Sequence, residues 1–437
     1  MQKLKITSGG PLVGEIRVPG DKSISHRAVM LGSIADGVSR IDGFLTGEDS
    51  INTARALAAM GVEIDGLGSE TLTVKGVGTG GLKEPKGELD LGNSGTSIRL
   101  LAGLLAGQGF GCTLTGDEYL RKRPMGRVVT PLTMMGAKVS GDGERHYPPL
   151  RIEPLARGSM KSVNYVSPIA SAQVKSAVLL AALYANGITS VTEPVKSRDH
   201  TERMLKHMGV EITHDGLKVA LKGGQRLRAL DFTVPGDLSS AAFFMVAAAI
   251  TPGSDLVIRD VGVNPTRTGI IDILRLMNAA ISVGEAREDG PEPVADIRVE
   301  YSDLRGIDID GELFVRAIDE FPILCIAAAA ASGVTAVSDA TELRVKESDR
   351  IATMALELDR LGVNVKETPD GIIIEGGRQF KAGTFDSHGD HRVAMAMAVA
   401  GLTACDGKEP GETTVNDTAC INTSFPGFEG LLESVRG

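Results

Sequence analysis

One short stretch of the sequence combines two cations with a carboxylate: Arg344-Val345-Lys346-Glu347-Ser348-Asp349-Arg350. Lys346, Glu347 and Arg350 stand at i, i+1 and i+4, and apolar residues follow at helical spacing from Ile351. We therefore predict that these charged residues open an amphipathic helix. On a solvated face they would form only local ion pairs, which is the simpler interpretation of the stretch taken alone. In a substrate site they could bind anions and move a proton.

Five expected helices begin with polar or basic residues instead of ordinary caps. A helix N-terminus carries free N–H groups and about half a positive charge, so it attracts phosphate and carboxylate. Arg and Lys add charge-assisted hydrogen bonds there. Because five such starts occur in one chain, we expect them to converge on a shared anion site. The opening residues are Lys22, Ser23 and Arg27; Asn93 to Thr96 with Arg99; Ser171 and Gln173; Lys346, Glu347 and Arg350; and Asp390, His391 and Arg392.

Two familiar site types fit the sequence poorly. Gly20-Asp21-Lys22-Ser23 resembles the end of a nucleotide P-loop, but Lys22 does not directly follow a Gly and the upstream Gly is missing. His388 and His391, with Asp390 between them, could suggest a metal, but no third ligand cluster accompanies them. A capped helix start is the better interpretation, so we expect no metal site.

Two kinds of helical segment alternate along the chain and must position these residues. Six are almost wholly apolar, which is typical of buried helices. Six are amphipathic, and most end in an apolar-Gly-Val pattern before a short strand. His200 and His207 fall in an amphipathic segment, where we expect them at the surface. The alternation predicts six β/α units of about 70 residues. The apolar segments are residues 27–35, 97–106, 173–185, 240–250, 322–331 and 391–404.

A coarser repeat divides the chain into halves. Val18-Pro19-Gly20-Asp21-Lys22-Ser23 recurs as Val234-Pro235-Gly236-Asp237-Leu238-Ser239. Pro-Gly-Asp is a common turn signal, but each copy here also precedes an apolar helix. We therefore predict domain crossings near Gly20 and Gly236. One domain would comprise residues 21–235 and the other residues 1–20 with 236–437, with three units in each.

Composition limits the partners. The net charge of −10 argues against nucleic acid, which usually requires a basic surface. The longest apolar runs fall short of the ~20 residues of a membrane span, and Met1–Leu12 does not resemble a targeting presequence. Four cysteines without C-x-x-C pairing indicate reduced thiols. We expect a cytoplasmic protein of two or three domains that binds neither nucleic acid nor membrane.

Seven motifs together resemble the family of 5-enolpyruvylshikimate-3-phosphate (EPSP) synthases, in order and over essentially the whole chain. The resemblance implies an α/β fold of two domains, each with three βαβαββ units around buried helices, and an interdomain cleft. It also implies transfer of the enolpyruvyl group from phosphoenolpyruvate to the 5-hydroxyl of shikimate 3-phosphate, in the pathway to chorismate and aromatic amino acids. No metal or organic cofactor is implied. The motifs are Gly20–Arg27, Gly92–Thr96, Arg123–Met125, Ala170–Gln173, Ile318–Glu320, Arg344–Arg350 and Gly389–Arg392.

The resemblance also assigns roles. It implies that Glu347 shuttles the proton at C3 of phosphoenolpyruvate, that Asp319 is the base for the 5-hydroxyl, and that Lys22 touches both substrates. A Glu flanked by cations should stay ionised in the free protein. We hypothesise that Glu347 protonates C3 only after the substrates bind and the cleft closes. The residues implied for phosphoenolpyruvate are Lys22, Gly95, Arg123, Gln173, Arg350 and Arg392. Those implied for shikimate 3-phosphate are Lys22, Ser23, Arg27, Ser171, Gln173, Arg198, Asp319 and Lys346.

Departures from the family pattern are informative. Ser171-Ala172-Gln173 stands where many members have Ser-Ser-Gln, and Asn422-Thr423-Ser424 stands where many have a Lys. With Lys175-Ser176 and Arg198–Glu202, the pattern resembles the second class of the family, in which Arg198 contacts shikimate 3-phosphate. Some members of that class tolerate glyphosate. Gly95 leaves room for this inhibitor, so glyphosate is a candidate ligand and the response to it stays open.

Two other functions would explain part of the sequence. The cell-wall enolpyruvyl transferase shares the fold and usually carries a reactive Cys in the loop equivalent to Leu120–Arg127, which has none here. A non-catalytic anion-binding protein would explain the Lys and Arg residues but not the carboxylates Asp319 and Glu347. We expect an enzyme that acts as a monomer.

Overall fold

The structure, a computed structural model, describes residues 2–288 and 290–437. These residues form two compact units. Unit 22–234 also includes residues 290–292, and unit 235–437 also includes residues 2–21. The domain assignment made above, 21–235 against 1–20 with 236–437, stays a prediction.

Unit 22–234 repeats one sheet pattern three times. Each sheet has four strands, with a parallel pair at one end followed by two antiparallel neighbours. The first sheet contains β14 (Phe232–Thr233), β3 (Asp36–Asp42), β5 (Leu72–Val77) and β4 (Glu63–Asp65). The second contains β6 (Leu89–Asp90), β7 (Cys112–Thr115), β9 (Tyr147–Ile152) and β8 (Val139–Asp142). The third contains β10 (Asn164–Val166), β11 (Ile188–Thr192), β13 (Lys218–Lys222) and β12 (Ile212–Asp215).

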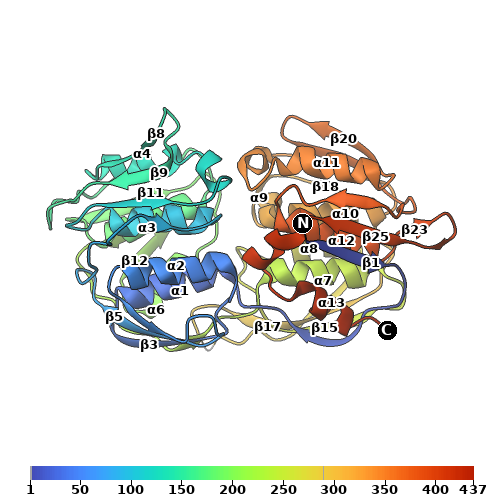
Figure 1. Ribbon diagram of the computed structural model, residues 1–437, viewed down its shortest axis with the longest axis horizontal. Helices are drawn as coiled ribbons and strands as arrows, with labels where there is room; N and C mark the ends of the chain where they lie inside the picture. Colours follow the sequence, from blue (N-terminus) through green and yellow to red (C-terminus); the bar gives the residue numbers. More distant parts are fainter. Residues whose placement is uncertain (1, 289) are drawn as a thin grey trace. The chain divides into compact units, whose positions relative to one another are not determined.

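The helices of unit 22–234 confirm the predicted alternation. The apolar ones are buried: α3 buries every residue except Thr96. In Figure 1, α1 and α2 lie over the sheet that holds β3 and β5. The apolar helices are α1 (Lys22–Ser33), α3 (Gly95–Leu105) and α5 (Ala172–Ala182). The amphipathic ones are α2 (Glu48–Ala59), α4 (Gly126–Met134) and α6 (His200–His207), and η1 (Leu120–Lys122) is a short 3-10 turn.

Close packing of α3 on α5 depends on Gly103. A Cβ at this position would lie 2.2 Å from the backbone oxygen of Ala177, so any side chain here would push the two helices apart. The absence of a side chain lets the backbones approach directly. The packing fixes the start of α3 relative to the start of α5, and both starts carry predicted site residues.

Unit 235–437 follows the same pattern in its first two sheets. These contain β2 (Val13–Arg17), β15 (Asp255–Gly262), β17 (Val294–Glu300) and β16 (Ala280–Val283), then β18 (Asp308–Ile309), β19 (Val334–Val337), β21 (Gly371–Glu375) and β20 (Asn364–Thr368). The third sheet has three strands in the described chain: β22 (Thr384–Asp386), β25 (Glu412–Asn416) and β1 (Lys3–Thr7). It departs from the predicted βαβαββ pattern because β1, from the other end of the sequence, pairs with β25 in place of a following hairpin. A two-stranded hairpin, β23 (Cys405–Asp406) with β24 (Glu409–Pro410), projects beside it.

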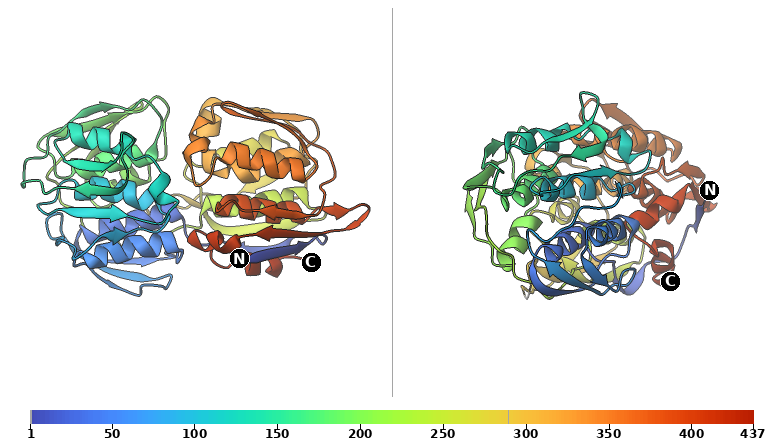
Figure 2. Two further views of the ribbon diagram at one scale, coloured as in Figure 1. Left: turned by 45° about the horizontal axis from the view of Figure 1, so that its top comes forward. Right: turned by 60° about the vertical axis from the view of Figure 1, so that its left-hand side comes forward.

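The buried helices of unit 235–437 pack against one another, and Figure 2 shows them enclosed by the sheets of this unit. All of α7 is buried, as its apolar sequence predicts. The buried helices are α7 (Leu238–Ile250), α10 (Phe321–Ala330) and α12 (His391–Gly401), and the amphipathic ones are α8 (Gly269–Leu276), α11 (Arg350–Arg360) and α13 (Phe428–Ser434). Shorter elements are α9 (Gly311–Val315), η2 (Ile318–Glu320), η3 (Thr341–Val345) and η4 (Thr418–Thr423).

The two copies of the Val-Pro-Gly-Asp repeat meet in unit 235–437. Gly20 and Gly236 form an antiparallel bridge. The carboxylates of Asp21 and Asp237 share one cation, Arg267, whose Nη1 is 3.1 Å from Asp21 Oδ2 and whose Nη2 is 3.2 Å from Asp237 Oδ1. Glu320 Oε1 lies 3.7 Å from the same Nη2. Burial alone would lower the pKa of Arg267, but these carboxylates outweigh it and raise the pKa. The two copies of the repeat are therefore joined to each other by the glycine bridge and by their shared cation, Arg267.

The described chain contains four free cysteines: Cys112, Cys325, Cys405 and Cys420. None of its helices within residues 2–288 and 290–437 has the length and apolar character needed to cross a membrane.

We predict that Arg267→Met lowers the free energy of unfolding by about 3–5 kcal/mol, because it leaves buried carboxylates without their shared cation. Urea denaturation followed by circular dichroism measures this change. The matched control is Arg298→Met: Arg298 pairs with Asp255 on an exposed sheet face, where the loss should stay below about 1 kcal/mol. Equal losses for the two variants would contradict the structural role of Arg267.

Candidate active site

The site residues of unit 22–234 begin at the first residue of α1. Lys22 Nζ lies 3.2 Å from Oδ2 of Asp49, which is in the first turn of α2. The two side chains are only 15% and 10% exposed. The ammonium group of Lys22 is therefore placed at a helix N-terminus by a carboxylate from a neighbouring helix.

Arg27 follows one turn later and donates hydrogen bonds from three nitrogens. Its Nη1 donates to the backbone oxygen of Ser23 at 2.8 Å, within α1. Its Nη2 donates to Ser176 Oγ at 2.8 Å and its Nε to Thr201 Oγ1 at 2.7 Å. Ser176 belongs to α5 and Thr201 to α6, so three helices orient this guanidinium.

Gly95 begins α3 and brings two guanidinium groups together. A Cβ at Gly95 would lie 2.9 Å from Nη1 of Arg123 and 2.9 Å from Nη1 of Arg99. Arg123 is buried and donates a hydrogen bond to Asn93 Oδ1. Ser94 caps the helix by accepting from a backbone N–H at 3.1 Å. The N-terminus of α3 and two arginines thus form one strongly positive surface.

The start of α5 joins this cluster through Gln173. Gln173 Oε1 accepts from Arg99 Nη1 at 2.7 Å, and Gln173 Nε2 donates to Thr96 Oγ1 at 3.0 Å. Ser171, the N-cap of α5, donates its backbone N–H to Glu193 Oε1 at 3.2 Å. Arg198 lies half-buried in the segment that leads into α6.

The site residues of unit 235–437 gather around Arg350, whose side chain is 1% exposed. Arg350 Nη2 donates to Glu347 Oε2 at 2.7 Å and Arg350 Nε to Asp390 Oδ2 at 2.8 Å. Its Nη1 lies 3.7 Å from Asp319 Oδ1. Burial alone would lower the pKa of Arg350, but the three carboxylates outweigh it and raise the pKa. This cation therefore stays charged and holds the three carboxylates together.

Two further contacts complete the group. Lys346 Nζ lies 3.5 Å from Asp319 Oδ1, so Asp319 faces two cations. Asp390 is the N-cap of α12 and accepts the backbone N–H of Arg392 at 2.9 Å. Asp390 thereby connects the start of α11, through Arg350, to the start of α12.

The predicted helix start at Lys346 and Glu347 is wrong. Helix α11 begins at Arg350, and Asp349 caps it by accepting the N–H of Ala352 at 3.1 Å. Arg344 fixes the preceding turn because its Nη1 pairs with Asp349 at 2.8 Å. Lys346 and Glu347 therefore lie outside the helix and reach Asp319 and Arg350. The apolar positions of the predicted helix are confirmed as buried: Ile351, Met354, Leu358 and Leu361.

The prediction for the histidines is wrong at one position. His200 is buried, with Nδ1 2.7 Å from Glu292 Oε1, because the segment that carries Glu292 covers the first turn of α6. His207 is exposed, as expected.

The pair considered for a metal makes other contacts. His388 Nε2 lies 2.8 Å from Glu357 Oε1, and this hydrogen bond raises the pKa of His388. His391 is the first residue of α12. Across the described residues, no group of three or more His, Cys, Asp and Glu side chains is placed to hold a metal ion.

Each predicted substrate-site residue thus lies in one of the two units, with the residues numbered 22 to 198 in unit 22–234 and those numbered 319 to 392 in unit 235–437. Sequence reasoning missed Asp49, which pairs with Lys22. Arg99 and Asp390 were expected at helix starts, but their contacts with Gln173 and Arg350 were not predicted. Asp390 had a visible signal, since an Asp before an apolar helix is a typical N-cap. Arg99 follows Gly95 by four residues and so falls on the same helix face. Asp49 had no such signal, because its partner Lys22 comes from another helix.

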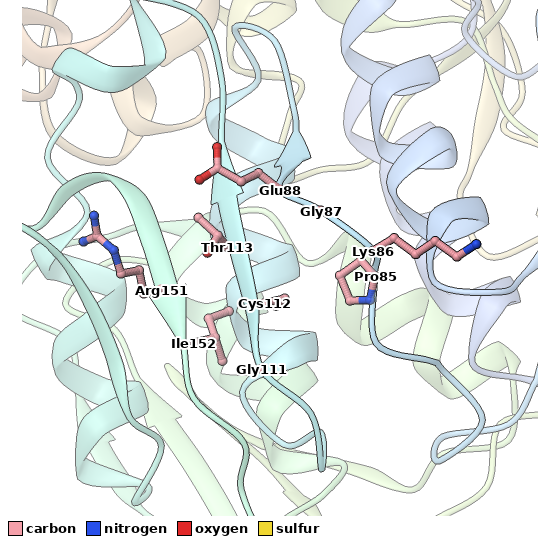
Figure 3. Close-up of a pocket in the computed structure, with 9 residues that line it drawn as sticks. All are labelled: Pro85, Lys86, Gly87, Glu88, Gly111, Cys112, Thr113, Arg151 and Ile152. Carbon is pink, nitrogen blue, oxygen red and sulfur yellow. The ribbon is translucent and has the colours of Figure 1, made fainter.

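Figure 3 shows a separate open groove between the Pro85–Glu88 segment and β7. Cys112 and Arg151 contribute to its lining, which contains none of the predicted substrate-binding residues. Burial, with a smaller contribution from Glu84, raises the pKa of the Cys112 thiol to about 12. This thiol stays protonated at neutral pH and is a poor nucleophile.

Comparison with known proteins identifies the family. The family model for EPSP synthase (3-phosphoshikimate 1-carboxyvinyltransferase) matches residues 6–432. A 3-phosphoshikimate 1-carboxyvinyltransferase of Geobacter metallireducens is 56% identical over 100% of this chain and 99% of its own length. One of Desulforudis audaxviator is 53% identical, with 99% of each chain covered. A solved structure of EPSP synthase from Acinetobacter baumannii has a TM-score of 0.88 at 47% identity, covering 100% of this chain and 98% of that one. The chain belongs to the EPSP synthase family, and the predicted α/β enolpyruvyl transferase fold is confirmed.

Proposed function

We propose that this protein transfers the enolpyruvyl (1-carboxyvinyl) group from phosphoenolpyruvate to the 5-hydroxyl of shikimate 3-phosphate and releases phosphate. The hydroxyl oxygen attacks C2 of phosphoenolpyruvate while C3 takes up a proton, which gives a tetrahedral adduct. The adduct then loses a proton from C3 and its phosphate from C2, which restores the double bond. The reaction needs a carboxyl group near C3, a base near the hydroxyl and cations for the anionic groups.

The observation that carries this proposal is the group around Arg350. The carboxylates of Glu347 and Asp319 both lie within ion-pair distance of the buried Arg350, although they come from different elements. Glu347 is suited to donate and recover the proton at C3, and Asp319 to accept the proton of the 5-hydroxyl. Lys346 stands beside Asp319, where its charge can also bind an anionic substrate. Asp390 already pairs with the buried Arg350, so Glu347 and Asp319 supply carboxylates beyond those that a single buried cation in an anion-binding protein would need.

The contacts in unit 22–234 support the binding roles that the family implies. Gly95, Arg123 and Gln173 form one positive cluster, which we assign to phosphoenolpyruvate together with Lys22, Arg350 and Arg392. The orientation of Arg27 by three helices suits a site for the dianionic 3-phosphate. We assign shikimate 3-phosphate to Lys22, Ser23, Arg27, Ser171, Gln173, Arg198, Asp319 and Lys346.

Three finer properties complete the proposal. Glyphosate is a candidate ligand for the space beside Gly95. The enzyme acts as a monomer. It works in the cytoplasm, in agreement with four cysteines that are free in the structure.

The direct test is phosphate release by the purified protein. We expect release with phosphoenolpyruvate and shikimate 3-phosphate together and none with either compound alone. UDP-N-acetylglucosamine in place of shikimate 3-phosphate serves as the control for the cell-wall reaction. Release of phosphate that requires the nucleotide sugar would overturn the assignment. Absence of release with either acceptor would favour the non-catalytic anion-binding protein instead.

A second prediction concerns Gly95→Ala. The added methyl group would approach two guanidinium nitrogens to 2.9 Å, so Arg99 and Arg123 must shift. We expect the KM for phosphoenolpyruvate to rise about tenfold or more, while that for shikimate 3-phosphate changes less than about twofold. Gly109→Ala is the matched control, because a Cβ there meets nothing within 4 Å. Steady-state kinetics with each substrate varied in turn measures both constants, and an unchanged KM for phosphoenolpyruvate would contradict the assignment of Gly95.

A further inference from the structure

A buried cluster of three charges lies in unit 22–234, outside the residues assigned to substrate. Lys175 Nζ is 2.8 Å from Glu193 Oε2 and 2.9 Å from Glu202 Oε1. All three side chains are 3% exposed. Burial alone would lower the pKa of Lys175, but the two carboxylates outweigh it and raise the pKa. Charges in an interior carry a large desolvation cost, so a cluster of this kind calls for a reason beyond stability.

One arm of the cluster holds the start of α5. Glu193 Oε1 accepts the backbone N–H of Ser171 at 3.2 Å and the hydroxyl of Ser197 at 2.5 Å. Lys175 Nζ also donates to the backbone oxygen of Ser197 at 3.3 Å. Ser171 is assigned to shikimate 3-phosphate, and Ser197 directly precedes Arg198, which is assigned to the same substrate. The pair of Lys175 with Glu193 therefore sets the positions of two binding residues.

The other arm holds the start of α6. Lys175 and Glu202 lie next in sequence to Ser176 and Thr201, whose hydroxyls are 2.8 Å apart and both accept hydrogen bonds from Arg27. The ion pair of Lys175 with Glu202 therefore lies next to the hydroxyl groups of Ser176 and Thr201, which orient Arg27. Within residues 2–288 and 290–437, Glu202 Oε2 has no hydrogen-bond partner, so the contact with Lys175 is the main restraint on this carboxylate.

We propose that Lys175 is a positioning residue for shikimate 3-phosphate, acting through Glu193 and Glu202. It fixes Ser171, Arg198 and Arg27 by tying α5 to the 193–202 segment. This inference rests on the proposed function. It predicts a selective effect, because Ser171, Arg198 and Arg27 are assigned to shikimate 3-phosphate alone. Gln173, which is assigned to both substrates, is held separately by Arg99 and Thr96.

The test is Lys175→Met, which keeps the length of the side chain and removes its charge. We expect the KM for shikimate 3-phosphate to rise about tenfold or more, with the KM for phosphoenolpyruvate changed less than about twofold and kcat less than about threefold. Lys138→Met is the matched control, because Lys138 pairs with Glu153 at the exposed surface of the same unit.

A pH profile and a second substitution distinguish a positioning role of Lys175 from a general loss of structure in the variant. Without Lys175, two buried carboxylates lose their common cation and repel each other, which favours binding of a proton between them. The KM for shikimate 3-phosphate should then fall as pH is lowered in Lys175→Met, in excess of any change in the unsubstituted protein. The double variant Lys175→Met with Glu202→Gln removes one of the two negative charges that Lys175→Met leaves unpaired. It should reverse at least about half of the increase in log KM for shikimate 3-phosphate.

Several outcomes would overturn the inference. An unchanged KM for shikimate 3-phosphate in folded Lys175→Met would do so, as would equal increases in the two KM values or no recovery in the double variant. If Lys175→Met does not fold, Glu202→Gln alone takes its place, because it keeps the pair of Lys175 with Glu193. A selective rise in the KM for shikimate 3-phosphate is then expected, and an unchanged KM would overturn the inference. Failure of the proposed function is separate, since it would appear as absent phosphate release in the unsubstituted protein.

Discussion

The buried guanidinium of Arg350 is the group on which the proposed chemistry of unit 235–437 depends. Moving a charged group out of water costs several kcal/mol, and the protein offsets this cost with carboxylates from three different elements. Glu347 comes from the turn before α11, Asp319 from η2 before α10, and Asp390 from the start of α12. A neutral residue at position 350 would remove the common partner of all three. The same cation therefore stabilises the fold locally and places the two proposed catalytic groups.

Helix starts organise the other unit in a comparable way. Gly103 allows α3 and α5 to pack with their backbones in direct contact, so the positive end of α3 meets the start of α5. Gln173 then bridges the two helices, with Arg99 on its oxygen and Thr96 on its nitrogen. An anion bound beside Gly95 would meet a helix dipole and two guanidinium groups, each of which favours negative charge.

Much of this could be predicted from the sequence. Wholly apolar segments identified the buried helices because only an interior accepts them on all sides. Ser171 and Asp390 were recognisable at helix starts, and the family motifs supplied the substrate-site residues that are proposed for both units.

Contacts between distant segments could not be predicted in this way. The burial of His200 depends on Glu292, about ninety positions away, and the third sheet of unit 235–437 depends on β1. Lys175 sits inside an apolar segment, and its two partners come from other segments, so periodicity alone gave it no role. The start of α11 was misplaced because Asp349, and not one of the earlier residues, is the cap, and the ion pair of Asp349 with Arg344 could not be predicted from the helical spacing.

The central claim is that Glu347, held by Arg350, exchanges a proton with C3 of phosphoenolpyruvate. The most direct test runs the reaction in D₂O and measures deuterium in the methylene group of the enolpyruvyl product by NMR. We predict deuterium in the product, because C3 becomes a methyl group that gains a solvent-derived proton and then loses any one of three. Glu347→Gln should lose both turnover and incorporation. A product without deuterium, or near-normal turnover and incorporation in Glu347→Gln, would contradict this mechanism.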